Sequence, residues 1–211
     1  ATTLIGLQRQ AIDPNSVSAV FVTHLHGDHF AGLVWWLVHA VHVAKRTAPL
    51  TVTGPAGLEK RFLTAAEALF PGSSTSPRQF ELTFVQYEEK KTLIVDGVSI
   101  TPFEVSHPSG APPYALRVAA DGRVVTFSGD TEWVENLIPA SAGADLFIAD
   151  CYGFEAPVRF HMNWTTIKAN LPRITARRVL LTHMGRDMLD HAQSVASDWV
   201  LTAQDGLVLD L

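Results

Sequence analysis

The sequence predicts an α/β protein with mixed sheets. Segments with helical periodicity alternate with short β-branched runs in the amino-terminal part of the chain and again in the carboxyl-terminal part. Between them, residues 81–128 hold closely spaced strand candidates separated by Asp-Gly turns. A chain of 211 residues with 47% hydrophobic content can bury one substantial core, so we expect a single domain over residues 1–211.

The amino-terminal elements follow from periodicity and turn residues. Residues 19–23 (AVFVT) form a β-branched run, and residues 32–43 are long enough for a helix. A second strand is expected at residues 50–53 and an amphipathic helix at residues 57–69. The Pro- and Ser-rich residues 71–77 (PGSSTSP) indicate an exposed loop.

The middle of the chain reads as sheet. The turn dipeptides Asp96-Gly97 and Asp121-Gly122 lie between apolar runs, and both residue types tolerate positive φ, which is typical of tight hairpins. The strands expected here are residues 82–87, 92–95, 99–105, 115–119 and 124–128.

Helices and strands alternate again in the last third of the chain. Residues 145–149 and 178–182 read as buried strands, residues 164–171 and 191–201 as helices, and residues 207–209 as a last strand. The sequence shows no internal repeat and no linker that would divide two domains.

Charge and cysteine usage narrow the class of partner. The formal net charge is −5 and the positive residues are scattered, so a polynucleotide substrate would need a local basic patch. Cys151 is the only cysteine, which excludes an internal disulfide and fits a reducing compartment, so we expect the cytoplasm.

The longest apolar stretch does not predict a membrane anchor. Residues 31–44 are interrupted by His39 and His42 and fall short of the roughly 20 residues that span a bilayer. The two histidines lack a nearby acidic partner in sequence, so we expect satisfied or solvent-facing imidazoles. The chain begins with Ala rather than Met and shows no secretory signal, and we expect that an upstream segment has been removed.

A histidine-rich loop carries the strongest chemical signal. His24, His26, Asp28 and His29 place three imidazoles and a carboxylate within six positions, between an expected strand and an expected helix. These are ligand types that borderline divalent metals accept, and a turn after a strand can direct alternate side chains at one point. The alternative is a polar surface loop with incidental histidines, which the strand-then-helix context disfavours.

Further donors follow other expected strands. His107 follows the strand at 99–105, Asp130 follows the strand at 124–128 within Ser-Gly-Asp-Thr, and His183 follows the strand at 178–182. Each alone could simply cap a turn. Together they lie at carboxyl ends of strands, where α/β folds assemble their sites, so they predict a metal site.

The order HxHxDH, isolated His, SGDT and terminal LTH resembles the binuclear hydrolases of the metallo-β-lactamase superfamily, from Ala19 to His183. The resemblance implies a four-layer αβ/βα sandwich with a dinuclear site along one edge between its two sheets. It also implies two divalent ions, zinc first, with manganese or iron as alternatives. One ion would be held by His24, His26 and His107, the other by Asp28, His29 and His183, with Asp130 bridging them.

The resemblance also implies the chemistry. Two adjacent ions lower the pKa of a bridging water, so the expected nucleophile is a metal-bridging hydroxide. Seven donors for two ions leave positions open for water and substrate. Asp28 could orient the hydroxide or act as its base.

A further histidine points to a branch of the superfamily. His161 opens the stretch HMNWTTIKANLPRITARRVLLTHM, which is similar to phosphodiesterases resembling ribonuclease Z, where a histidine at this place assists the leaving group. His161 is therefore a candidate general acid, a role that suits imidazole. The alternative is a helix-start histidine bonded to a nearby carbonyl.

The expected substrate is a small-molecule or short nucleotide phosphodiester. The chain lacks the long inserted arm of ribonuclease Z, so transfer-RNA processing is not expected, and cyclic phosphodiesterases without the arm fit the length better. Three alternatives stay open. One is a carboxyl ester, thioester or lactone hydrolase, which has less use for His161. The others are a non-catalytic metal-binding scaffold and an iron-dependent redox member of the superfamily.

The amino terminus departs from the family pattern. Only 23 residues precede His24, whereas the family places several strands there, so we expect a sheet shortened at the N-terminus. An unpaired sheet edge would result, and a partner chain, as in a homodimer, could cover it. The loops at residues 108–113 and 151–157 match no particular family and leave the substrate open.

Several other residues have simpler interpretations. Trp35 and Trp36 on the apolar helix are expected in the core. Cys151 is expected to be a small buried residue rather than a nucleophile, and Asp150 to orient His161 or a ligand imidazole. Four arginines flank the last motif and could either pair with a phosphate or be solvated: Arg173, Arg177, Arg178 and Arg186.

Overall fold

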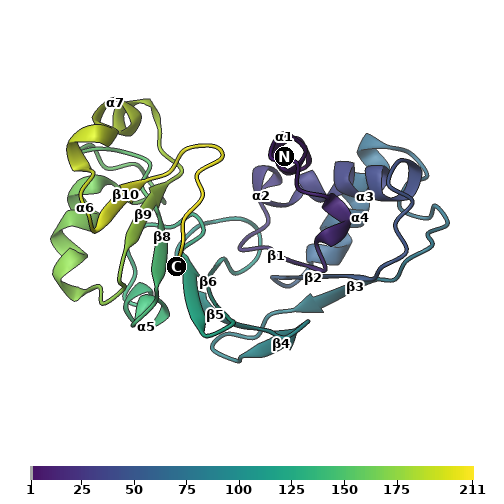
Figure 1. Ribbon diagram of the computed structural model, residues 1–211, viewed down its shortest axis with the longest axis horizontal. Helices are drawn as coiled ribbons and strands as arrows, with labels where there is room; N and C mark the ends of the chain where they lie inside the picture. The colour runs from purple at the N-terminus through teal and green to yellow at the C-terminus, as the bar shows by residue number, and fades with distance from the viewer. Residues whose placement is uncertain (1) are drawn as a thin grey trace. The chain divides into compact units, whose positions relative to one another are not determined.

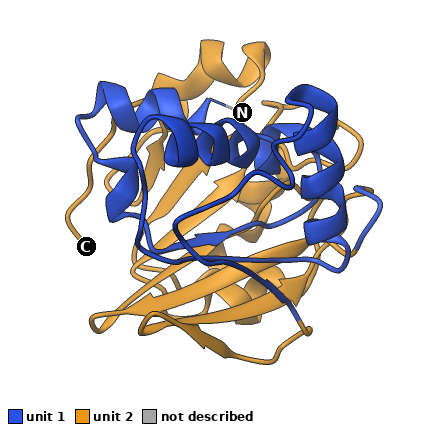
Figure 2. Cartoon of the chain, turned by 90° about the vertical axis from the view of Figure 1, so that its right-hand side faces the viewer, with its two compact units in different colours: residues 1–87, 109–111 blue, residues 88–108, 112–211 orange. Residues whose placement is uncertain are grey.

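The computed structural model describes residues 2–211, which form two compact units (Figure 2). Unit 1 runs to Tyr87 and includes Ser109–Ala111, and unit 2 comprises Glu88–Pro108 and Pro112–Leu211. Unit 1 is drawn in blue and unit 2 in orange. The expectation of a single domain stays a prediction.

Unit 1 contains a parallel three-stranded sheet in the order β1-β2-β3. The strand expected at residues 82–87 forms, but it pairs with β2 and does not join the hairpins of the middle region. The strands are β1 (Ala19–Phe21), β2 (Leu50–Gly54) and β3 (Leu82–Gln86). The helices are α1 (Thr3–Arg9), η1 (Pro14–Ser16), α2 (Gly27–Phe30), α3 (Gly32–His42) and α4 (Leu58–Leu69).

Helices α3 and α4 pack with the sheet of unit 1 into one hydrophobic core (Figure 1). The core includes Leu37 of α3, Phe62 of α4 and Val52 of β2. The expectation that both tryptophans of α3 are core is wrong for Trp35, which is 42% exposed, whereas Trp36 is buried. Consecutive helical residues differ by about 100° around the axis, so neighbouring side chains cannot both face the sheet.

Unit 2 contains a mixed seven-stranded sheet in the order β10-β9-β8-β7-β6-β5-β4. Neighbours from β4 to β7 are antiparallel and those from β7 to β10 are parallel. The strands are β4 (Leu93–Val95), β5 (Val98–Glu104), β6 (Tyr114–Ala120), β7 (Arg123–Phe127), β8 (Leu146–Asp150), β9 (Val179–Thr182) and β10 (Val200–Thr202). The helices are α5 (Leu137–Ser141), α6 (Trp164–Asn170), η2 (Leu171–Arg173) and α7 (Arg186–Val195).

Both Asp-Gly dipeptides form the predicted hairpin turns. Asp96 and Gly97 have φ of 49° and 79°, and Asp121 and Gly122 have φ of 49° and 75°. Val95 pairs with Val98 and Ala120 with Arg123, so each turn has two central residues. Two consecutive positive φ values match the twist of the flanking strands, which is why these dipeptides predict hairpins reliably.

The end of the chain differs from expectation. The helix predicted at residues 191–201 is instead α7, which begins at Arg186 and ends at Val195, and residues 200–202 form β10. Met188 and Val195, seven positions apart, are the buried residues of α7, so this earlier register places its apolar face on the core. Val200 is buried and pairs with Val179 of β9. The strand predicted at residues 207–209 does not form, and Val208 is 83% exposed.

The helices of unit 2 share a core with its parallel strands. Leu137 of α5, Ile167 of α6 and Met188 of α7 join Phe147 of β8 and Leu181 of β9 in one buried cluster. The cluster thereby fixes the carboxyl ends of β8 and β9, where Asp150 and His183 lie. Within residues 2–211, no helix has both the length and the apolar character needed to cross a bilayer.

Candidate metal centre

The histidine loop of unit 1 gathers around the fully buried His24. After β1 the chain turns, and α2 begins at Gly27 with His26 as its N-cap. The ring centroid of His24 lies 5.0 Å from that of His26 and 3.9 Å from that of His29. Asp28 is exposed, and its Oδ2 lies 3.5 Å from Nε2 of His29. Unit 1 therefore brings its four sequence-predicted ligands close together.

An arginine that sequence reasoning missed anchors this loop. Nη1 of Arg61 in α4 donates to the carbonyl oxygen of Leu25 at 2.8 Å and to that of Ser109 at 2.9 Å. Leu25 lies between His24 and His26, so the bond orients the peptide that separates two predicted ligands. Nothing in the sequence pattern marks Arg61, since an arginine on an amphipathic helix normally indicates a solvated face.

The predicted ligands of unit 2 all follow strands that run in the same direction. β5 and β7 are both antiparallel to β6, and β7, β8 and β9 are mutually parallel. His107 follows β5, Asp130 follows β7, Asp150 ends β8 and His183 follows β9. Their side chains therefore meet at the carboxyl edge of one sheet, the usual place for a site in an α/β fold.

Asp130 lies close to both predicted imidazole ligands of unit 2. Its Oδ2 is 4.0 Å from Nε2 of His107 and 3.6 Å from Nε2 of His183. Nδ1 of His107 bonds to the carbonyl oxygen of Phe160 at 3.0 Å, and Nδ1 of His183 bonds to Asp150 at 3.2 Å. Each ring thus uses Nδ1 for the protein and presents Nε2 to Asp130, the arrangement found in metal-ligating histidines.

Two strained residues help to set this geometry. Phe160 has φ of 66° and His183 has φ of 56°, in the left-handed region that residues other than glycine rarely adopt. The Phe160 carbonyl accepts the His107 bond, and His183 directs its ring toward Asp130. Such strain persists only where the surrounding structure holds it, commonly at functional sites.

The Asp150 carboxylate is fully buried and joins two imidazoles. Its Oδ2 accepts from Nδ1 of His161 at 2.9 Å and from the Thr131 backbone N–H at 3.0 Å. Its Oδ1 accepts from Nδ1 of His183 at 3.2 Å. The expectation that Asp150 orients His161 is confirmed, and Asp150 also holds the ring of His183, whose role as a metal ligand stays a prediction. Thr131 is a contact that the sequence analysis missed, although it belongs to the Ser-Gly-Asp-Thr motif.

The donor set of unit 2 fits a divalent ion. His107, Asp130 and His161 each offer a ligand atom within 4.8 Å of the others. Asp150, His161 and His183 lie equally close, but their proximity is that of the hydrogen bonds to Asp150. Imidazole nitrogen and carboxylate oxygen are the donor types that zinc, manganese and iron accept.

Two residues after β8 differ in what they can contribute. Cys151 is buried, and burial, followed by the negative charge of Asp150, raises the pKa of its thiol to about 12, so it stays protonated and is no nucleophile. Tyr152 is 39% exposed, and its ring lies 5.2 Å from that of His161 and 5.5 Å from that of His183. Tyr152 lies in the loop at residues 151–157, and no sequence motif marks it.

The arginines flanking the last motif are engaged elsewhere. Arg177 and Arg178 lie at the amino end of β9, whereas His183 follows its carboxyl end. Their partners are Glu135 for Arg173, Asp145 for Arg177, the Asp210 carbonyl for Arg178 and Asp190 for Arg186.

Known proteins share both sequence and fold with this chain. Residues 4–184 match the family model of the beta-lactamase superfamily domain. Ribonuclease Z from Lacticaseibacillus casei is 27% identical over an alignment that covers 85% of this chain and 72% of that protein.

Two solved structures share the fold. Human short-form tRNase Z is 20% identical with a TM-score of 0.76, and the match covers 99% of this chain and 85% of that one. The metallo-beta-lactamase fold protein YhfI from Bacillus subtilis is 21% identical with a TM-score of 0.74, covering 98% and 83%. The chain has mixed α/β sheets and the fold of these two structures. Because the family model matches most of its length and its relatives include ribonuclease Z, the chain belongs to the beta-lactamase superfamily and is a metal-dependent hydrolase of the metallo-β-lactamase fold.

Proposed function

We propose that this chain hydrolyses phosphodiester bonds, with two divalent metal ions and with His161 as the general acid for the leaving group. The observation that carries the proposal is the 2.9 Å bond between Nδ1 of His161 and the buried Asp150. Relatives named ribonuclease Z, and a structural neighbour named as a diphosphatase from the PhnP family, support phosphorus–oxygen bond cleavage.

The proposed metal ligands are those that the family resemblance implies. Divalent ions, zinc first, would supply an activated water and positive charge against the developing negative charge of the transition state. Asp130 suits a bridging role because its Oδ2 lies near Nε2 of both His107 and His183. Asp28 is exposed beside His29 and is proposed to orient the attacking water or to accept its proton. The full set is His24, His26, Asp28, His29, His107, Asp130 and His183.

His161 is suited to deliver a proton. Its Nδ1 donates to Asp150, which holds the ring, so Nε2 is the atom that would protonate a leaving oxygen. The ring centroid lies 4.9 Å from that of His107 and 5.0 Å from that of His183, so this donor adjoins the proposed metal ligands of unit 2. A histidine that only capped a helix would not need a buried carboxylate partner.

The proposed substrate is a small or short-nucleotide phosphodiester. A net charge of −5 provides no broad attraction for a long polyanion, which favours a short substrate. The proposed compartment is the cytoplasm, since the one thiol is buried and free. Self-association as a homodimer stays a prediction.

The test compares two phosphodiesters that differ in their leaving group, bis-p-nitrophenyl phosphate and a dinucleoside monophosphate. If His161 protonates the leaving oxygen, His161→Ala should lower turnover of the dinucleoside by roughly 100- to 10,000-fold. The loss should be much smaller for p-nitrophenolate, because that anion leaves without a proton. His191→Ala is the matched control: its ring stacks on Phe154 at 3.9 Å, outside the proposed centre.

The other outcomes separate the alternatives. Equal losses on both phosphodiesters would refute the general-acid role. Turnover of p-nitrophenyl acetate that is indifferent to His161, without diesterase activity, would favour a carboxyl ester hydrolase. Two bound metals per chain without either activity would indicate a scaffold, and fewer than two would contradict the dinuclear centre.

A further inference from the structure

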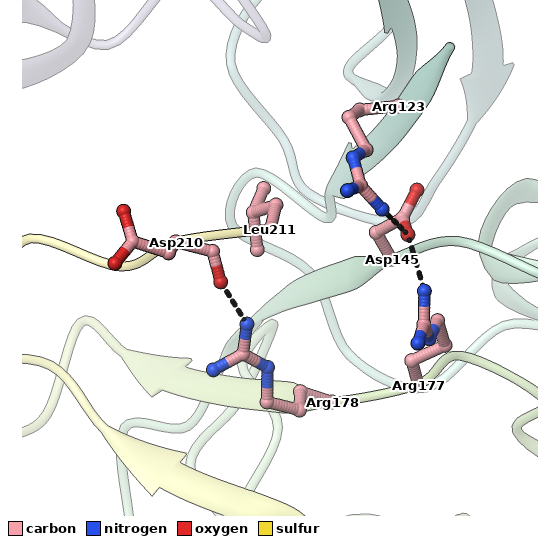
Figure 3. A pocket seen from close by; sticks show the side chains of 6 residues that line it. All are labelled: Arg123, Asp145, Arg177, Arg178, Asp210 and Leu211. Carbon is pink, nitrogen blue, oxygen red and sulfur yellow. Dashed lines mark hydrogen bonds and ion pairs between the residues drawn. The ribbon is translucent and has the colours of Figure 1, made fainter.

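A second polar feature of unit 2 lies at the opposite ends of the same strands. A pocket of about 410 Å³ is lined by the residues shown in Figure 3: Arg123, Asp145, Arg177, Arg178, Asp210 and Leu211. Arg123 begins β7, Asp145 directly precedes β8, and Arg178 directly precedes β9. Five residue steps along β8 separate Asp145 from Asp150, which is about 16 Å in a strand. The pocket is therefore separate from the imidazoles of unit 2.

Asp145 holds two of the arginines in place. Its Oδ1 accepts from Nη1 of both Arg123 and Arg177, each at 3.2 Å, and its Oδ2 accepts from the Val124 backbone N–H at 2.9 Å. The Val124 bond first, and then the two arginines, hold the pKa of Asp145 below its ordinary value, so the carboxylate is charged at neutral pH. One fixed carboxylate thus orients two guanidinium groups.

The pocket is lined by three arginines and two aspartates, and of the two aspartates only Asp145 pairs with arginine through its carboxylate. Nη2 of Arg178 donates to the Asp210 backbone carbonyl, which carries no formal charge. Across the described residues 2–211, no carboxylate lies within ion-pair distance of Arg178, and Figure 3 shows the Asp210 carboxylate directed away from it. Arg123 and Arg177 therefore share one carboxylate, and Arg178 has no carboxylate partner.

Most of the guanidinium donors remain available. A guanidinium group carries five N–H donors, and Arg123 and Arg177 each commit one to Asp145. Their side chains are 50% and 71% exposed, so a ligand can reach them from solvent.

We propose that this pocket binds a phosphate group, through Arg177 and Arg178 with Arg123 completing the site. A phosphate offers several acceptor oxygens and up to two negative charges, which match forked guanidinium donors. The volume lies within the roughly 300–1,000 Å³ of small-ligand pockets, so it accommodates free phosphate or the phosphate of a nucleotide. The site is independent of the proposed hydrolysis.

The experiment measures binding of inorganic phosphate and of uridine 5′-monophosphate by titration calorimetry. The full chain is compared with Arg178→Gln, whose lost bond is to a backbone carbonyl of the exposed Asp210, so folding should be retained. Arg186→Gln is the matched control, because Arg186 is 89% exposed and pairs with Asp190 on α7. We expect Arg178→Gln to raise Kd about tenfold or more, as loss of a charge-assisted bond would. We expect no change in the control.

Amide chemical shifts locate the bound phosphate, and the comparison of the two probes shows whether the pocket prefers free phosphate or the phosphate of a nucleotide. Bound phosphate should shift the backbone amide signals of Val124 and Arg178, not those of His161 and His183. Equal binding of both probes would indicate a site for phosphate itself, and tighter binding of the nucleotide would indicate a phosphate carried on a nucleoside. Absence of binding, equal weakening in Arg186→Gln, or shifts confined to His161 and His183 would overturn the proposal. Arg178→Lys, which keeps the charge but loses the fork, should fall between the parent and Arg178→Gln.

Discussion

Replacing Asp150 with asparagine should weaken zinc binding by roughly 10- to 100-fold, as expected when a residue that orients metal ligands is altered. Asparagine has almost the shape of aspartate, so the change leaves packing intact and removes a charge and one acceptor position. Asp150 is fully buried, and its carboxylate is shared by His161, His183 and the Thr131 backbone.

The size of the loss in zinc affinity follows from the hydrogen bonds that Asp150 makes. If the amide oxygen stays toward Thr131 and His161, the NH₂ group meets Nδ1 of His183, and two donors face each other. His183 must then move its proton to Nε2, the atom that lies 3.6 Å from Asp130, and a protonated nitrogen cannot bind a cation. A hydrogen bond to a charged group contributes about 1.5–3 kcal/mol. Each 1.4 kcal/mol changes an equilibrium about tenfold, which leads to the same range.

The assay is competition for zinc between the chain and a chromogenic chelator. Asp190→Asn is the control, since Asp190 is 60% exposed and pairs with Arg186 on the surface of α7. Urea unfolding of both metal-free variants checks that the fold persists. Unchanged zinc affinity in Asp150→Asn, or an equal loss in both variants, would refute the argument that Asp150 sets the tautomer of His183.

Three further predictions concern the folded chain. Arg61→Met removes the donor that is shared by the carbonyl oxygens of Leu25 and Ser109, so it should lower the free energy of unfolding, measured in urea, by about 1–3 kcal/mol. The control Lys60→Met on the same helix should change it by less than about 0.5 kcal/mol. Native Cys151 should react with iodoacetamide at pH 8.5 far more slowly than in urea, because the pKa of its buried thiol is raised to about 12; equally fast labelling would contradict this. Gly122→Ala should lower the free energy of unfolding by about 1 kcal/mol because φ at this position is 75°, and an unchanged urea midpoint would count against the turn assignment.

Local chemistry made much of the fold predictable. The Asp-Gly dipeptides predict their hairpins because positive φ is a property of the residues themselves. The helices at 32–43 and 57–69 were predicted to within one residue, since their apolar spacing directly reflects the face that is buried. The helix predicted at residues 191–201 was wrong, because the apolar residues near 200 could either continue a helix or form a strand. The position of Val200 beside Val179 decided between them.

The sequence by itself determined the kind of site: three imidazoles and a carboxylate in one loop, with further donors after later strands, predict a metal centre because ligand chemistry belongs to residue types. Only the tertiary structure decided how the rings are held. Asp150 meets both His161 and His183, 11 and 33 positions away, because strand pairing brings those segments together. The same strand pairing brings Arg123 and Arg177, at the starts of β7 and β9, to the carboxylate of Asp145. Periodicity reports the preference of a short segment, whereas such contacts arise from the register between strands distant in the chain.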